Sequence, residues 1–160
     1  MGIALGAVFG LAGTVVAQAS LRQAFWLVDG VGLVVATALL TVRFFRKGHD
    51  CIAAGFLVYA IAESVLLSGT AAGLAGSVPS FGGGVALWAT SLLLTSIPKG
   101  FAWWIRLVGT LAAVLFAITA GRIFWGDQLL PISSPLPFFA YPFLVITFGG
   151  WIWTLIRQDF

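Results

Sequence analysis

Residues 51–74, CIAAGFLVYAIAESVLLSGTAAGL, form a stretch that is long and apolar enough to cross a lipid bilayer. About 20 apolar residues make one transmembrane helix, because a helix rises about 1.5 Å per residue and the hydrocarbon core is about 30 Å thick. One carboxylic acid, Glu63, lies near the middle of this stretch. The stretch therefore predicts a membrane-spanning helix with a single ionisable group at its centre.

The whole chain has the same apolar character. Of its 160 residues, 61% are hydrophobic and 8% are charged, whereas a soluble domain carries about 25% charged residues. Such a chain cannot cover a water-facing surface, so the lipid bilayer is its expected partner. We therefore predict an all-α polytopic integral membrane helix bundle, with residues 1–160 as a single transmembrane domain. No targeting extension is recognisable, which fits a multi-pass protein of the bacterial cytoplasmic (inner) membrane.

The hydrophobic pattern predicts six transmembrane helices, at residues 2–20, 25–45, 51–74, 82–97, 101–125 and 138–156. Basic residues are enriched in cytoplasmic loops of membrane proteins. Six spans place two basic residues, Arg22 and Arg122, on one side of the membrane. They place the remaining six on the other side, which predicts that both termini are cytoplasmic; these six are Arg43, Arg46, Lys47, Lys99, Arg106 and Arg157.

Two connections stand out by composition. Residues 75–84, AGSVPSFGGG, lack charge and are rich in Gly, Ser and Pro, which predicts a flexible turn. The connection at residues 126–141 contains Pro131, Pro135 and Pro137, and this proline density excludes a regular helix.

Small residues recur at four-residue spacing in two of the predicted helices. In lipid, helices associate through close packing rather than through the hydrophobic effect, and small residues let their backbones approach. The two stripes predict either helix crossings within the monomer or an interface with another chain. Their members are Gly2, Gly6 and Gly10 in the first helix, and Gly109, Ala113, Ala117 and Gly121 in the fifth.

The residues required by familiar intramembrane enzymes are missing from the pattern. One histidine, His49, lies in a predicted cytoplasmic turn, and Asp29 is the one aspartate placed within a span. One cysteine excludes an internal disulfide, and the scattered ligands exclude a metal cluster or a bis-histidine haem. The basic residues are also too scattered for nucleic-acid binding. We therefore predict a protein without enzymatic activity, cofactor or metal.

Glu63 is the strongest candidate for a functional residue. A charged acid in the middle of the membrane costs about 2.5–3.5 kcal/mol, so its side chain should face the bundle interior and find partners. Counting residues to the same depth predicts a polar layer around it, formed by Tyr59, Thr14, Thr37, Ser91 (or Thr90) and Thr147. This layer is either structural, with a protonated Glu63 joining helices, or a site for a proton, a cation or a polar ligand group.

A second acidic group lies nearer the outer interface. Asp29 stands about one turn inside its predicted helix, and Arg122 ends another helix at a similar depth. We predict an Asp29–Arg122 ion pair that clamps these helices, with Arg22 and Asp127 as competing partners.

Two functions fit these features. The first is a non-enzymatic subunit or binding module, which packs with a membrane-protein partner or a second copy, or holds a lipid or another apolar small molecule. The alternative is a small proton- or solute-coupled transporter or channel that uses Glu63. Transporters often contain inverted repeats, but residues 82–156 contain no counterpart of Glu63.

Overall fold

The computed structural model describes residues 2–70 and 72–157, which fold into helices without strands. The long helices are α2 (Ala19–Arg46), α3 (Asp50–Thr70), α5 (Val78–Ser96), α6 (Trp103–Phe124) and α7 (Tyr141–Arg157). The shorter ones are α1 (Gly2–Val15), α4 (Gly73–Gly76) and the 3₁₀ helix η1 (Phe138–Ala140).

Five segments are long and apolar enough to cross a membrane: α2, α3, α5, α6, and α7 together with η1. This confirms an all-helical chain with several helices of membrane-spanning length. The first helix, α1, is shorter than the span predicted at residues 2–20. Helix α1 has 14 residues, about 21 Å at about 1.5 Å per residue, against a hydrocarbon core of about 30 Å. It begins beside Gly32 and Ala36, in the middle of α2.

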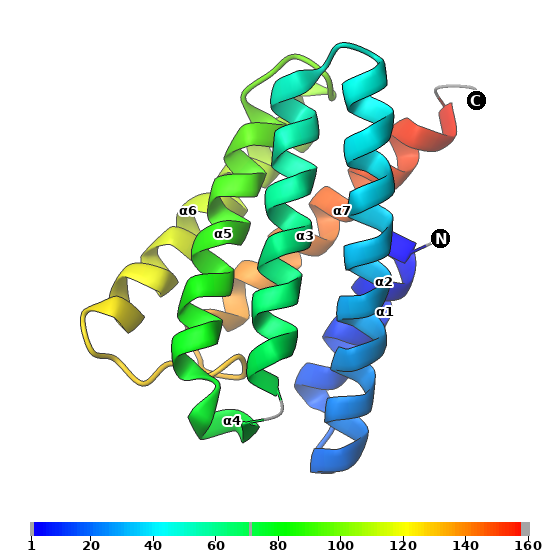
Figure 1. Cartoon of the computed structure of the whole chain (residues 1–160). Helices are drawn as coiled ribbons and strands as arrows, with labels where there is room; N and C mark the ends of the chain where they lie inside the picture. The colour runs from blue at the N-terminus through cyan, green and yellow to red at the C-terminus, as the bar shows by residue number, and fades with distance from the viewer. Residues whose placement is uncertain (1, 71, 158–160) are drawn as a thin grey trace.

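The long helices form a closed arrangement around a shared interior. Figure 1 shows α2, α3 and α5 side by side, with α7 crossing behind them at a steep angle. Helix α1 packs on α2, helix α6 packs on α5, and α7 contacts both α1 and α6. Every long helix therefore presents one face to the interior and another to the surroundings, which are lipid if the chain lies in a membrane.

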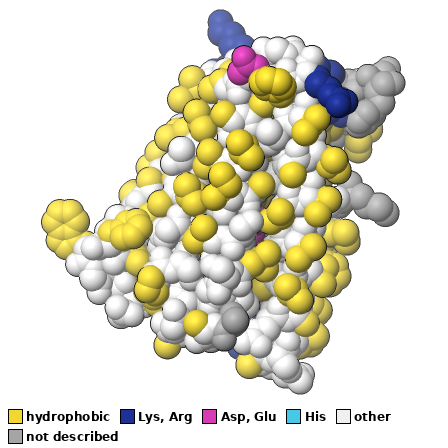
Figure 2. All heavy atoms as spheres, in the orientation of Figure 1, with side chains coloured by type: hydrophobic (Ala, Val, Ile, Leu, Met, Phe, Trp, Pro, Cys, Tyr) yellow, Lys and Arg dark blue, Asp and Glu magenta, His cyan; other side chains and the backbone are white. Residues whose placement is uncertain are grey.

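Charged residues gather at the two ends of this bundle. Helices α2 and α3 meet at a tight turn at the upper end in Figure 1, and α5 and α6 are joined at the same end. In Figure 2 the visible side of the bundle is mostly hydrophobic or uncharged, and lysine and arginine side chains project at that upper end. This end carries the six residues Arg43, Arg46, Lys47, Lys99, Arg106 and Arg157, whereas Arg22 and Arg122 belong to the opposite end.

The turn between α2 and α3 is specified locally. Gly48 has a positive φ of 73°, a conformation that glycine adopts without steric cost. The amide of His49 donates to the carbonyl of Phe44 at 2.9 Å, and the amide of Gly48 donates to Phe45 at 3.0 Å. These two bonds satisfy carbonyls at the end of α2 and reverse the chain into α3.

The first connection differs from the prediction. The break between helices falls at residues 16–18, where Gln18 is extended, rather than at Arg22 and Gln23. The Arg22 guanidinium donates to the carbonyl of Ala17 at 2.9 Å, which satisfies a backbone acceptor at the break. Helix α2 therefore starts six residues before the predicted residue 25, and Arg22 and Asp29 lie deeper within it.

The prediction of a flexible turn at residues 75–84 was wrong for most of its length. Helix α4 occupies Gly73–Gly76, and α5 begins at Val78 with Pro79 in its first turn, where the missing amide hydrogen carries little cost. The glycines after Pro79 are packed: Cβ atoms on Gly82 and Gly84 would come within 2.7 Å of Ile123 and 2.5 Å of Leu66. These glycines favour a close helix crossing rather than a loop.

Candidate functional site

A cavity of about 300 Å³ lies between α1, α2, α3, α5 and α7. Its lining is mainly apolar, with Leu33, Leu66 and Leu144 among the contributing side chains. It extends from Glu63 and its neighbours toward the end where α2 begins and α3 ends, and the lining there includes Ala19, Arg22, Thr70 and Gly73. The cavity thus joins the interior of the bundle to the end with fewer basic residues.

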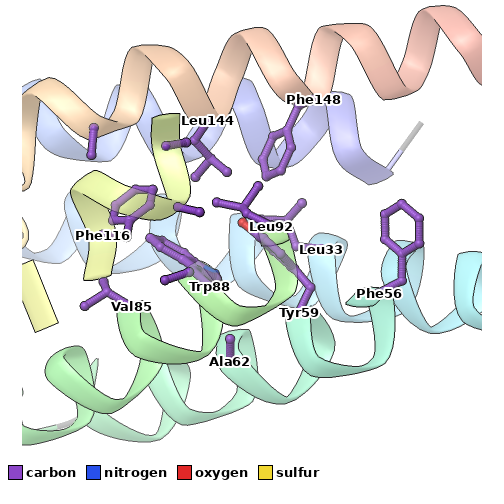
Figure 3. Close-up of a cluster of buried hydrophobic side chains, with 14 of the residues drawn as sticks. Leu33, Phe56, Tyr59, Ala62, Val85, Trp88, Leu92, Phe116, Leu144 and Phe148 are labelled. Atoms are coloured by element: carbon purple, nitrogen blue, oxygen red, sulfur yellow. The ribbon is translucent and has the colours of Figure 1, made fainter. Parts of the chain in front are cut away.

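Glu63 reaches the cavity from α3 and is 3% exposed. The indole Nε1 of Trp88, on α5, donates a hydrogen bond to Glu63 Oε1 at 2.8 Å. Trp88 is itself buried: its ring stacks on Tyr59 at 5.9 Å and meets Phe116 edge-on at 5.1 Å, and Figure 3 shows these rings packed together. The hydrogen bond fixes one carboxyl oxygen of Glu63 and joins α3 to α5.

Tyr59 lies one turn before Glu63 on α3, and its side chain is fully buried. Its hydroxyl lies beside the Glu63 carboxyl, within reach of a hydrogen bond to it, although the geometry of that bond is not ideal. The Tyr59 side chain lines the cavity. A phenol that can both donate and accept is therefore available to a molecule bound beside Glu63.

Asp29 reaches the same cavity from α2. It lies ten residues after Ala19, about 15 Å along the helix, and shares a helix face with Arg22, Trp26 and Leu33. Its Oδ1 is buried without a hydrogen-bond partner among the described residues. The Asp29 side chain packs against Gly10 of α1, which has no side chain. A Cβ atom at Gly10 would come within 2.8 Å of Asp29 Oδ2.

The predicted ion pair between Asp29 and Arg122 was wrong. Arg122, at the end of α6, instead forms a salt bridge of 2.7 Å with Asp127, one of the competing partners, in the following loop. Both side chains are about half exposed. Gly126, with a φ of +111°, ends α6 and turns the chain so that Asp127 folds back onto the last helical turn. The local pair needs no helix crossing, whereas Asp29 faces the interior.

The predicted polar layer does not form a connected network around Glu63. Thr14 lines the cavity, but its hydroxyl donates to the carbonyl of Leu11. Thr37 and Thr147 likewise bond to carbonyls four residues earlier, at 2.7 and 2.8 Å. Ser91 is buried, lies outside the cavity lining and has no hydrogen-bond partner in the described part of the chain. Threonine in a helix commonly satisfies itself in this way, so equal depth does not produce contact with Glu63.

The two small-residue stripes have different surroundings. Gly2, Gly6 and Gly10 face α2, where added Cβ atoms would come within 2.5–2.8 Å of its atoms. In α6, Gly109 and Ala113 are buried, whereas Ala117 and Gly121 are exposed. A helix turns about 100° per residue, so a stripe at four-residue spacing drifts by about 120° between Gly109 and Gly121 and leaves the packed face.

The cavity residues that were not predicted to line a site include Trp88, Tyr141 and Arg22. A signal existed for Trp88, since it is the tryptophan placed away from a membrane interface, and a buried indole N–H needs an acceptor. Tyr141 follows the proline-rich connection, and its hydroxyl donates to the carbonyl of Pro131 at 3.0 Å. This bond holds the connection against the start of α7.

The described residues contain no group of three His, Cys, Asp or Glu side chains that could hold a metal ion. The site is therefore described by one cavity, two carboxyl groups and the aromatic side chains around them. No protein-family model, curated protein or solved structure matches this chain.

Proposed function

We propose that this chain is a non-enzymatic integral membrane protein that holds a lipid-like or other apolar small molecule in the cavity between its helices. The observation that supports this function is the cavity itself. Its volume of about 300 Å³ is at the lower end of the range of about 300–1,000 Å³ that small-molecule sites occupy. Its lining combines many apolar groups with a few polar ones, as such sites do. A membrane-protein partner or a second copy of the chain would use the outer faces of the helices.

Filling the cavity tests this function. Val145 lines the cavity from α7, whereas the adjacent Ile146 is 49% exposed and outside the lining. We expect Val145→Trp to remove a small molecule that copurifies with the parent protein in mild detergent, as measured by native mass spectrometry. Ile146→Trp places the same side chain on the outer face, and this variant should retain the small molecule. A parent protein that carries no small molecule, or equal occupancy in both variants, would contradict the function.

We further propose that the basic end of the bundle, which includes the end of α7, faces the cytoplasm of a bacterial cell, so that the cavity opens away from it. Helix α1 begins beside the middle of α2, so it does not start at that end. Cys51 provides the test, because it is the only cysteine in the sequence and lies exposed near the basic end, at the start of α3. A membrane-impermeant maleimide should label Cys51 in inverted vesicles and leave it unlabelled in intact spheroplasts. Labelling in spheroplasts alone would reverse the orientation.

The second candidate function is proton- or solute-coupled transport through Glu63. It is favoured by one specific observation: Glu63 and Asp29, from two different helices, line the same cavity. If the protein transports protons, Glu63→Gln should abolish proton flux in liposomes, as measured with an internal pH dye. Gln keeps an oxygen that can accept the hydrogen bond from Trp88, so the fold should persist. Unchanged flux in the variant, or no flux in the parent, would rule out this function.

A further inference from the structure

Two carboxyl groups from different helices line the cavity. Asp29 and Glu63 lie near enough to interact electrostatically, and both line the cavity. In the described part of the chain, neither forms a salt bridge with a basic residue. Trp88 donates to Glu63 Oε1, the Tyr59 hydroxyl lies beside the same carboxyl, and Asp29 Oδ1 has no hydrogen-bond partner among the described residues. A carboxylate offers about four acceptor sites, so most of this capacity is unused.

The buried Tyr59 hydroxyl lies beside the Glu63 carboxyl and extends the polar part of the cavity wall. It is fully buried, lines the cavity and has no well-formed hydrogen bond. Buried polar groups are almost always paired with protein, water or ligand. Tyr59 and Glu63 lie on α3 and Asp29 lies on α2, and all three side chains line the same cavity.

The aromatic lining favours an organic cation over a metal ion. Trp26, Trp88 and Tyr141 join Tyr59 in the lining, and electron-rich ring faces attract ammonium groups. Hard metal ions such as Ca²⁺ and Mg²⁺ instead take about six or more oxygen ligands, and the mainly apolar wall does not supply them. The ligand should therefore combine one positive charge with an apolar body.

Arg22 does not neutralise the two acids. It precedes Asp29 by seven residues, about 10 Å along α2, toward the end of the cavity. Its Nη2 donates to the carbonyl of Ala17 at 2.9 Å, and its buried Nε has no hydrogen-bond partner among the described residues. The two acids therefore lie deeper in the cavity than the guanidinium, and an anionic ligand would find the Arg22 side chain at the mouth.

We propose that the cavity binds a hydrophobic monoamine, whose ammonium group lies between Asp29 and Glu63 and whose apolar body lies along the leucine-lined wall. With one positive charge on the ligand, one of the two carboxyl groups keeps a proton, so the filled site is neutral. Tyr59 accepts from the ammonium or donates to the protonated pair. This inference rests on the proposed binding function and specifies its ligand class.

Three probes that share an octyl chain separate charge from apolar contact: n-octylammonium, n-octanol and n-octanoate. The readout is the rise in melting temperature of the purified full chain in a maltoside detergent, since a ligand that binds only the folded state stabilises it. The parent protein should bind octylammonium about tenfold or more tightly than octanol, which corresponds to about 1.4 kcal/mol. Octanoate should give the smallest shift.

Neutral variants assign the effect to the two acids. Asp29→Asn and Glu63→Gln should each reduce the preference for octylammonium over octanol by about tenfold, while the octanol shift persists and shows that the cavity is intact. The matched control is Asp127→Asn, because Asp127 is a half-exposed acid outside the cavity. It should keep the full preference.

The possible outcomes distinguish this inference from the binding function. Equal binding of octylammonium and octanol in parent and variants would overturn the cation inference and leave the apolar binding function standing. A preference for octanoate that is lost in Arg22→Gln would overturn it in favour of an anionic ligand. If none of the three probes shifts the parent, or if Val145→Trp leaves their shifts unchanged, the cavity is not their site and both proposals fail.

Discussion

Replacing Gly55 with leucine is expected to destabilise the bundle by about 3 kcal/mol, at the upper end of the usual cost of overpacking. Gly55 lies where α3 crosses α5. A Cβ atom there would come within 2.6 Å of Thr95 Cγ2 and 3.1 Å of the Ser91 carbonyl oxygen. A side chain can rotate away, but the carbonyl belongs to the α5 backbone, so the two helices would have to separate. Unfolding in mixed micelles with increasing dodecyl sulfate measures this loss.

The matched control for Gly55→Leu is Gly121→Leu on α6. A Cβ atom at Gly121 meets nothing within 4 Å, and the position is exposed. Leucine is also a better helix former than glycine by roughly 1 kcal/mol. The control should therefore match or exceed the stability of the parent protein. If both variants lose stability equally, the close crossing of α3 and α5 is not what Gly55 permits.

Replacing Trp88 with alanine should lower the free energy of unfolding by about 3 kcal/mol, as truncation of a large buried aromatic side chain typically does. The indole is 7% exposed and packs between Tyr59 and Phe116. Its removal leaves a void where three rings meet, because these neighbours belong to helices that are held by other contacts. It also leaves Glu63 without the hydrogen bond from Nε1.

A conservative variant separates packing from hydrogen bonding at this position. Trp88→Phe keeps an aromatic ring and removes only the N–H donor and part of the volume. Interhelical hydrogen bonds in membrane proteins contribute about 0.6–2 kcal/mol, so we expect a loss near 1 kcal/mol. In a double-mutant cycle with Glu63→Leu, the two substitutions should be coupled by a similar amount. Strict additivity would mean that Trp88 and Glu63 do not bond to each other.

The candidate site was only partly predictable. Glu63 and Tyr59 were predictable because one acid in a long apolar segment must face the interior, and because residues one turn apart share a helix face. Depth counting then chose Thr37 and Thr147, whose hydroxyls bond within their own helices. Residue counting gives only the depth of a side chain in the membrane. Two side chains at one depth make contact only if their helices are neighbours and are rotated to face each other, and residue spacing does not specify either property.

Composition and residue order were sufficient to predict helices of membrane-spanning length and the distribution of charge along the bundle. Long apolar segments leave helices as the structure that satisfies backbone hydrogen bonds in lipid, and the basic residues gather at one end of the antiparallel bundle because they flank the ends of successive segments. These properties follow from composition and order along the chain.

The tertiary structure alone decided which groups meet. Helix α1 ends at Val15, and Arg122 forms its salt bridge with Asp127. Glu63 accepts a hydrogen bond from Trp88, and Asp29 lines the same cavity as Glu63. Each outcome depends on how far a helix is rotated and which neighbour it faces. In a chain whose helices are apolar on nearly every side, the hydrophobic pattern does not mark the inner face. Close packing and a few polar contacts mark it instead, and only the folded arrangement reveals them.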